Sequence, residues 1–376
     1  MPALDGVRGI AILSVLLFHF AGPLTPAGHV ETILKIVARS GWIGVDLFFV
    51  LSGYLITGIL LDTRGSNHYF RNFYARRILR IFPLYYGYLA ALLVASIFAE
   101  ISGLASRTGA HVPNLWLWTY LSNYAVAGGG WNAVTGSTVH FWSLAIEEQF
   151  YLCWPLVVAR LERRNLARVA ALLLVGAALA RVVLTIAGAS RLLLYVSTPT
   201  RLDGFCLGAL LATGVRDPAW RARIGRWGPV TGIGALTCVG TLAAFRGGLR
   251  FDDAIIQLAG YSSIALLAAT LVANALGQPL SRLRSFLTTA PLKELGKYSY
   301  GIYVFHVPVR SLLVRLMPLS GPSFPAPVYH AFFLIVGLGC SCAAGWLSWY
   351  LYESRFLALK ARFLYGQAEV RVQPNV

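Results

Sequence analysis

The stretch LDGVRGIAILSVLLFHFAG, residues 4–22, is a nearly continuous apolar run with an arginine near its start and a histidine within it. A helix that starts near Arg8 at the cytoplasmic surface rises ~1.5 Å per residue and carries the His19 imidazole ~16 Å inward. This places His19 about halfway along the segment and close to the bilayer midplane. An ionisable group at that depth is costly and indicates a functional site. We therefore expect His19 to serve chemistry or transport.

The composition indicates a polytopic membrane protein. Of the 376 residues, 57% are hydrophobic and only 12% are charged, and the mean hydropathy is +0.64. A soluble domain carries roughly a quarter charged residues. The five cysteines lie inside apolar runs without zinc-ligand spacing, so we expect them to pack in the core, with no disulfide and no metal site.

Apolar windows between loop signals predict an all-α transmembrane bundle of about ten helices. The sixth window is interrupted by the sequence Thr198-Pro199-Thr200. The predicted helices cover residues 7–22, 42–61, 78–100, 140–159, 167–187, 192–214, 228–245, 254–275, 297–316 and 328–352.

Lysine and arginine gather in alternate loops, and this sets the orientation. Most of the 32 basic residues fall on one side of the predicted spans. The positive-inside rule assigns that side, with both chain termini, to the cytoplasm. The net charge of +17 is therefore mainly topological and does not indicate a nucleic-acid partner. We expect one integral membrane domain over residues 1–360 and a short basic cytoplasmic tail without fixed structure over residues 361–376.

Three arginines mark the cytoplasmic mouth of the third predicted helix, in the segment ARRILRIFP (residues 75–83). Arg77 and Arg80 are three residues apart and share a helix face, with Arg76 beside them. Guanidinium groups suit phosphate because they donate paired hydrogen bonds, so the cluster could hold a polyanion. Ordinary positive-inside anchoring is the alternative.

The segment HFWSLAIEEQFYL (residues 140–152) places two adjacent carboxylates, Glu147 and Glu148, in an apolar run. His140 lies seven residues before Glu147, on the same helix face and ~10 Å away along the axis. Buried carboxylates call for an arginine or histidine partner or a role in proton transfer. A pair of carboxylates at the outer interface is the alternative.

Further ionisable residues lie in other predicted helices. His306 is a second intramembrane imidazole, Arg201 and Asp203 suggest a buried ion pair or network, and Asp46 lies near the outer end of the second helix. Ser52-Gly53 is more typical of close helix packing than of a nucleophile. Several of these groups share similar predicted depths, which suggests one polar cavity inside the bundle, joined to a basic mouth. The set comprises His19, Glu147, Arg201, Asp203 and His306.

Six ordered segments together resemble membrane acyltransferase family 3, whose members include O-acetyltransferases of bacterial polysaccharide, lipopolysaccharide and peptidoglycan and acyltransferases of macrolides. The segments are LDGVRGIAILSVLLFHF (4–20), FFVLSGYLI (48–56), ARRILRIFP (75–83), HFWSLAIEEQFYL (140–152), TRLDGFCLGALLA (200–212) and LGKYSYGIYVFH (295–306). The resemblance implies a bacterial inner-membrane enzyme with ten core helices. It also implies an acyl-CoA co-substrate, acetyl-CoA first, that enters from the cytoplasm, with no permanently bound cofactor, and an acceptor hydroxyl on a carbohydrate, glycoconjugate or small molecule.

On this resemblance, Arg77 and Arg80, with Arg76 and Arg8, would hold the acyl-CoA donor. Acyl transfer to a hydroxyl needs a base and a stabilised oxyanion. His19 would be a general base or a transient acyl carrier, and Glu147 would orient His19 or deprotonate the acceptor. The supporting or acceptor-side residues are Asp46, His140, Glu148, Arg201, Asp203 and His306.

Two other classes of protein remain as alternatives. A proton-coupled secondary transporter also places His, Glu and Arg at the midplane, but the sequence shows no inverted repeat. A non-catalytic scaffold leaves the buried charges unexplained. The acceptor, the acyl chain and the oligomeric state are not fixed by the sequence. Trp42, Trp116, Trp118 and Trp131 could stack on a sugar ring or belong to an interfacial aromatic belt.

Overall fold

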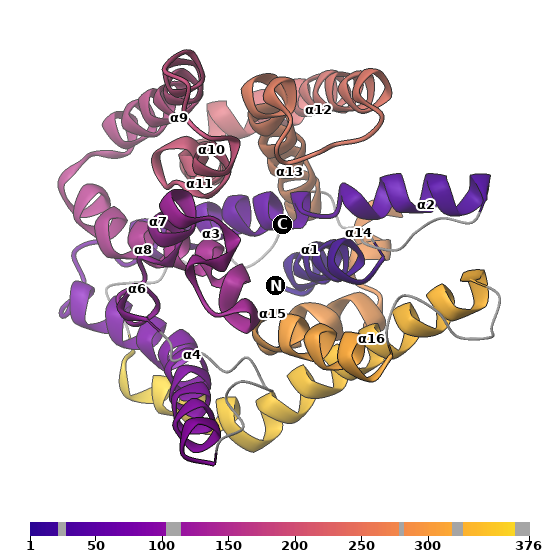
Figure 1. Ribbon diagram of the computed structural model, residues 1–376. Coiled ribbons are helices and arrows are strands. Elements are labelled where there is room, and N and C mark those ends of the chain that lie inside the picture. Colours follow the sequence, from indigo (N-terminus) through magenta and orange to yellow (C-terminus); the bar gives the residue numbers. More distant parts are fainter. Residues whose placement is uncertain (22–27, 103–113, 278–281, 318–325, 365–376) are drawn as a thin grey trace.

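The computed structural model describes residues 1–21, 28–102, 114–277, 282–317 and 326–364 (Figure 1). These residues form helices and irregular segments and no β-strand, which confirms the all-α prediction. Beyond Leu364, the predicted tail lies outside the described residues.

A helix lies at each of the predicted spans, with the sixth span divided in two. The helices are α1 (Pro2–Phe20), α3 (Ile43–Asp62), α4 (Tyr69–Ile101), α8 (Trp142–Arg160), α9 (Arg163–Ile186), α10 (Arg191–Val196) with α11 (Leu202–Gly214), α12 (Pro218–Arg246), α13 (Tyr261–Leu276), α15 (Ala290–Leu316) and α16 (Ala326–Ser348).

Short helices connect them. They are α2 (His29–Arg39), α6 (Leu115–Trp118), α7 (Ser122–Gly129), α14 (Arg282–Leu287), α17 (Ser354–Ala358), the 3-10 helices η1 (Trp131–Ala133), η2 (Gly136–Phe141), η3 (Pro199–Arg201) and η6 (Leu359–Arg362), and the π-helices η4 (Ile256–Gly260) and η5 (Trp349–Glu353).

Seven helical stretches in the described ranges are long and apolar enough to cross a membrane. They support a multi-pass membrane protein. The predicted spans outside this set coincide with α8, with the divided pair α10 and α11, and with α15. These helices carry many of the ionisable residues singled out in the sequence. The count of ten spans and the cytoplasmic location of the termini stay predictions.

Helix α1 lies inside the bundle, in contact with α3, α13 and α15 (Figure 1). Its approach to α15 depends on glycine, because a Cβ atom on Gly296 would lie 1.8 Å from the carbonyl oxygen of Asp5. The pairing of α3 with α11 has the same basis, since a Cβ on Gly53 would lie 2.1 Å from the carbonyl oxygen of Phe205. This confirms the close packing predicted at Ser52-Gly53.

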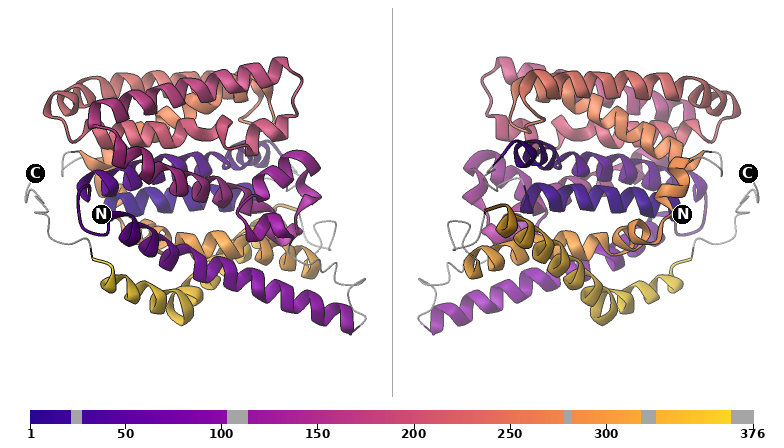
Figure 2. Two further views of the ribbon diagram at one scale, coloured as in Figure 1. Left: turned by 90° about the vertical axis from the view of Figure 1, so that its left-hand side faces the viewer. Right: turned by 90° about the vertical axis from the view of Figure 1, so that its right-hand side faces the viewer.

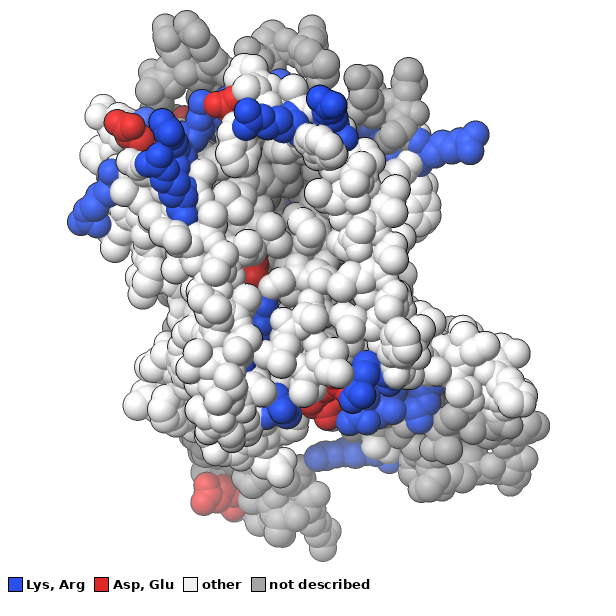
Figure 3. Space-filling model, turned by 90° about the horizontal axis from the view of Figure 1, so that it is seen from above, with Lys and Arg blue, Asp and Glu red and all other residues white. Residues whose placement is uncertain are grey.

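The outward faces of the peripheral helices are apolar, as lipid contact requires. Figure 3 shows charged residues gathered towards two opposite ends of one face, with a largely uncharged band between them. Large apolar side chains are exposed on α4, α9, α12 and α16, among them Phe98, Leu172, Ile233 and Ile335. The apolar band is consistent with membrane burial.

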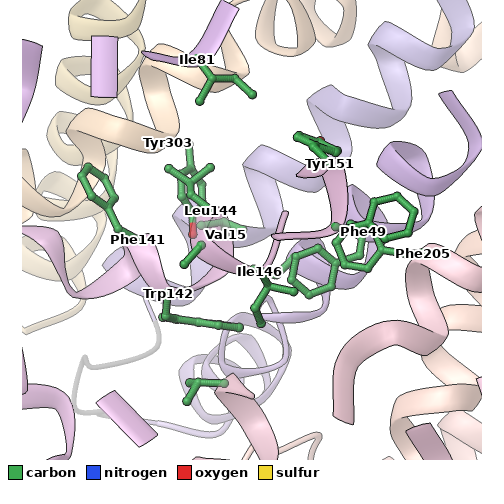
Figure 4. Packing of buried hydrophobic residues seen from close by; sticks show 14 of the residues in the cluster. Val15, Phe49, Ile81, Phe141, Trp142, Leu144, Ile146, Tyr151, Phe205 and Tyr303 are labelled. Atoms are coloured by element: carbon green, nitrogen blue, oxygen red, sulfur yellow. The ribbon is translucent and has the colours of Figure 1, made fainter. Parts of the chain in front are cut away.

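Aromatic packing fills the interior between α3, α8 and α11. The rings of Phe49 and Phe205 stack with centroids 4.6 Å apart (Figure 4). Phe150 also stacks on Phe205, with centroids 4.5 Å apart. The contact between Phe49 and Phe205 joins segments more than 150 residues apart in sequence. Together the three rings fix how α3, α8 and α11 face one another.

The first helix differs from its prediction. It begins at Pro2, a favourable first-turn residue, and ends at Phe20, so His19 lies in its last turn and not halfway along it. Figure 2 shows the start of α1 and the described C-terminal helices at the same end of the molecule. The amide of Asn72 donates to the carbonyl of Leu364 at that end.

Candidate active site

Three of the four predicted donor arginines line a cavity at the end of the bundle that holds both described chain ends. We call it the inner cavity; its volume is about 770 Å³, including its opening. Helices α1, α3, α4, α8 and α15 contribute its walls. Its polar lining comprises Arg8, Ser52, Arg77, Arg80, Ser143, Glu147, Tyr151, Ser299, Tyr300 and Tyr303.

The arginines reach this cavity from two helices. Helix α4 begins at Tyr69, nine residues before its predicted start, so Arg77 and Arg80 are one helical turn apart and both line the cavity. Arg8 joins them from α1 and also forms an ion pair with Asp5 at 3.1 Å. This site combines positive charge with forked donors that suit phosphate.

Arg76 lies elsewhere. Its guanidinium donates to the backbone carbonyls of Lys360 and Phe363 at 3.1 and 3.2 Å, so it fastens the C-terminal helices to α4. Lys360 itself lies within electrostatic reach of Arg8, Arg77 and Arg80. In the sequence, the only sign that Lys360 belongs to this cluster is that it is basic.

Glu147 faces the inner cavity and is held by two hydroxyl groups. Ser52 Oγ donates to Glu147 Oε1 at 2.9 Å, and Tyr151 Oη donates to Ser52 Oγ at 2.8 Å and lies 3.4 Å from Glu147 Oε2. Arg77 lies over the Tyr151 ring, 5.7 Å from its centroid. Ser52 therefore has a polar role that close packing at Gly53 alone does not explain.

Glu148 is not among the residues that line the inner cavity. It lies near the tyrosines of α4, α15 and the segment after α6, including Tyr120 and Tyr300. The two adjacent carboxylates thus occupy different surroundings, because neighbours on a helix point about 100° apart.

Two further cavities meet at His19. We call the first the aromatic cavity, because aromatic rings line several of its sides; its volume is about 780 Å³, including its opening. We call the second the arginine cavity, because three arginines line it; its volume is about 970 Å³, including its opening. Phe18, His19 and Phe251 line both. The aromatic cavity is further lined by Val15, Trp42, Val45, Trp131, Val139, His140, Trp142, Tyr195 and Tyr303. The arginine cavity is further lined by Arg39, Arg250, Asp252 and Arg310.

Three imidazoles lie side by side at this point. The His306 ring is 4.7 Å from the His19 ring and 4.8 Å from the His140 ring, centroid to centroid. His306 Nδ1 lies 2.6 Å from the carbonyl oxygen of Tyr303, so this nitrogen carries the proton in the neutral ring. Nε2 is then the acceptor nitrogen of His306. The Nε of Arg310 donates to the His19 carbonyl at 2.8 Å and fixes the end of α1.

The single polar cavity predicted from equal depths is wrong. Glu147 faces the inner cavity, whereas His19 faces the aromatic and arginine cavities. Tyr303 and Val45 line both the inner and the aromatic cavity. Depth along a helix was predictable, but the direction in which each side chain points depends on packing between helices.

Tyr303 is the polar residue of the two that line both cavities. Its hydroxyl lies 2.5 Å from Ser143 Oγ and donates to the carbonyl of His140 at 2.8 Å. The ring projects from α15 towards the segment of α8 that carries Leu144 (Figure 4). Tyr303 is therefore positioned to separate the arginine-lined space from the space that contains His19.

Arg201 and Asp203 form a buried network, but not with each other. Arg201 donates to Asp46 at 2.8 Å, and Arg181 donates to Asp203 at 2.9 Å, with all four side chains almost fully buried. The Arg201 guanidinium lies 4.3 Å from the Tyr261 ring centroid. These residues line none of the three cavities, and the network joins α3, α9 and α11. Its geometry indicates a structural role.

Among the predicted tryptophans, Trp42 and Trp131 line the aromatic cavity, whereas Trp116 and Trp118 do not. Trp42 is held by a hydrogen bond from Nε1 to the carbonyl of Leu249 at 2.8 Å. Within the described ranges, no group of three or more His, Cys, Asp or Glu side chains is arranged to hold a metal ion.

The fold and its charged internal cavities define a multi-pass helical membrane protein with a buried polar site. The chain belongs to acyltransferase family 3, because the model described as "Acyltransferase domain" matches residues 1–346. The family resemblance inferred from the six sequence segments is thereby confirmed.

Individual relatives agree with this assignment. The chain is 32% identical to YrhL of Bacillus subtilis (strain 168) over 345 residues, which cover 86% of this chain and 51% of that protein. It is 28% identical to the peptidoglycan O-acetyltransferase OatA of Listeria monocytogenes over 342 residues, with 86% and 51% covered. It is also 28% identical to the O-acetyltransferase OatA of Staphylococcus aureus (strain NCTC 8325 / PS 47), with 82% and 50% covered. The chain thus spans about half the length of these relatives. No solved structure matches it significantly.

Proposed function

We propose that this protein is an O-acetyltransferase of a bacterial inner membrane. It takes an acyl group, acetyl first, from cytoplasmic acyl-CoA and passes it to a hydroxyl of a cell-envelope carbohydrate. Family membership and the activities named for the relatives support the reaction class. They favour a transferase over a proton-coupled transporter, which the buried charges alone would also allow.

One observation carries the proposal: an arginine-lined cavity and a histidine-lined cavity meet at a shared wall. Arg8, Arg77 and Arg80 would bind the phosphates of the donor at the inner cavity. The acyl thioester on its pantetheine arm would pass the wall at Tyr303 towards His19. The acceptor would enter the aromatic cavity from the other side.

His19 would then act in one of two ways. As a general base, its imidazole takes the proton of the acceptor hydroxyl while the hydroxyl oxygen attacks the thioester carbonyl; the C–S bond breaks and CoA leaves as the thiolate. As an acyl carrier, its nitrogen attacks the thioester carbonyl first, the C–S bond breaks and CoA leaves as the thiolate. The acceptor hydroxyl then attacks the acyl-imidazole, the C–N bond breaks, and the released imidazole takes up the hydroxyl proton. His306 lies against His19 in either case.

Glu147 would act on the donor side, because it shares a cavity with the arginines and not with His19. Ser52 donates to the Glu147 carboxyl and Tyr151 donates to Ser52, so the carboxyl is held at a defined position beside Arg77.

The test uses the purified protein in lipid nanodiscs with [14C]acetyl-CoA and a cell-wall oligosaccharide. Acceptor-dependent release of CoA, with radiolabel recovered as an ester on the saccharide, is the expected result. Transport of label into sealed vesicles without any ester would instead support the transporter alternative.

A further inference from the structure

The arginine cavity beside His19 has a charge that topology does not explain. Arg39 ends α2, Arg250 lies between α12 and η4, and Arg310 lies on α15. In the predicted orientation all three lie towards the outer side, where the positive-inside rule places few basic residues. A cluster there needs another reason, such as a ligand.

Most of this positive charge is not neutralised. Arg250 forms an ion pair with Asp252 at 3.0 Å. Arg310 uses its Nε on the His19 carbonyl, and within the described residues neither its two terminal nitrogens nor the Arg39 guanidinium has a hydrogen-bond or ion-pair partner. The cavity therefore offers forked donors from two guanidinium groups against one already paired carboxylate.

The arginine cavity shares lining residues with the aromatic cavity, which is the space that would hold a sugar ring. Phe18, His19 and Phe251 belong to both the arginine and the aromatic cavity. A ligand with a ring among the tryptophans and an acidic group among the arginines would pass directly over the His19 imidazole.

We propose that the arginine cavity binds an acidic group of the acceptor, a carboxylate or a phosphate, and so holds the acceptor hydroxyl at His19. This inference rests on the proposed function and narrows its substrate to acidic saccharides. An anionic lipid headgroup has the same chemistry, but the shared walls with the aromatic cavity favour a saccharide.

The test measures binding and does not depend on catalysis. Four disaccharides, in two matched pairs, are titrated into the protein in zwitterionic nanodiscs. The first pair is neutral di-N-acetylchitobiose and its 1-phosphate, and the second is a muramyl disaccharide with a free lactyl carboxylate and its carboxamide. The variants are Arg39→Gln, Arg310→Gln and the double variant. Arg191→Gln is the matched control, since Arg191 lies outside the cavity and donates to Thr185.

We expect one acidic disaccharide to bind at least about tenfold more tightly than its neutral counterpart, because a hydrogen bond to a charged group is stronger than one to a neutral group. The double variant should lose this preference, and Arg191→Gln should keep it. The pair that shows the preference identifies carboxylate or phosphate as the recognised group.

Equal binding of acidic and neutral saccharides, or a preference that survives the double variant, overturns the inference. The titration is repeated in nanodiscs that contain anionic lipid. Loss of the preference for acidic saccharides there also overturns the inference, because the cavity would then bind a lipid headgroup. Acetyl transfer from acetyl-CoA is measured separately. Its absence would refute the proposed function while leaving a measured anion preference intact.

Discussion

The hydroxyl of Tyr303 lies 2.5 Å from Oγ of Ser143, where α15 meets α8 and the inner cavity meets the aromatic cavity. Ser143 lines only the inner of these two cavities, whereas Tyr303 lines both. The inner cavity and the aromatic cavity, which are the proposed donor and acceptor sides, thus meet at one aromatic side chain held by hydrogen bonds at its tip.

Replacing this side chain should uncouple the two sides. Tyr303→Ala opens the wall, so water reaches the thioester, and we expect acceptor-independent release of CoA to rise several-fold. Tyr303→Phe keeps the ring and loses the bonds to Ser143 and to the His140 carbonyl. It should lower stability by about 1–3 kcal/mol without the rise in hydrolysis. Equal hydrolysis by the two variants would contradict a barrier role for the ring.

His19→Ala should reduce acceptor-dependent release of CoA by about 10²–10⁴-fold, the usual contribution of a positioned base. The matched control is His29→Ala, an exposed histidine at the start of α2. Thermal unfolding in detergent checks that both variants are folded. Wild-type rates in folded His19→Ala would remove the imidazole from the mechanism.

Arg77→Ala and Arg80→Ala should each weaken CoA binding by at least about tenfold, because a charge-assisted hydrogen bond contributes about 1.5–3 kcal/mol. Titration of CoA measures the effect, which should shrink at high salt. Arg164→Ala, an exposed arginine on α9, is the control for loss of charge alone. Unchanged affinity in the double variant would leave the pair with only a topological role.

Asp46→Asn should destabilise the bundle far more than Asp62→Asn. The first change leaves Arg201 buried without its carboxylate partner, at a cost of about 3–5 kcal/mol. The second removes the partner of Arg216 at a position where the Asp62 side chain is 58% exposed, which costs about 0–1 kcal/mol. Comparison of the two unfolding midpoints in detergent measures the difference. Similar shifts would contradict a structural role for the buried pair.

Asp252→Asn should strengthen binding of an acidic disaccharide and leave neutral disaccharide binding unchanged, because it frees Arg250. Hydrogen bonds from Arg250 lower the pKa of Asp252 below its usual range. Because the pKa of Asp252 is depressed in the folded state, its ion pair with Arg250 stabilises the fold above about pH 4, the ordinary pKa of a carboxyl group. This stabilisation is lost as the pH falls further. Titrations of the muramyl disaccharide, whose carboxylate stays ionised, between about pH 5 and pH 8 should therefore show a constant effect of the substitution. An effect that fades within that range would contradict the assignment.

The sequence by itself determined the helical class, the membrane setting and the family. It also drew attention to ionisable residues within the predicted spans, although not to Arg181 or Arg310. Hydropathy and glycine placement act locally along the chain, so the positions of the helices and the close approach at Gly53 were predictable. The pairing of Arg77 with Arg80 was also predictable, because residues three apart lie on the same face of any helix.

Only the tertiary structure decided which of these residues meet. The rotation of each helix, set by stacked rings such as Phe49 on Phe205, turned Glu147 to one cavity and His19 to another. It also gave Asp203 its partner Arg181 and brought Arg310 to His19 across 291 positions of sequence. Spacing within one helix cannot encode such contacts, because they depend on the packing of several helices at once.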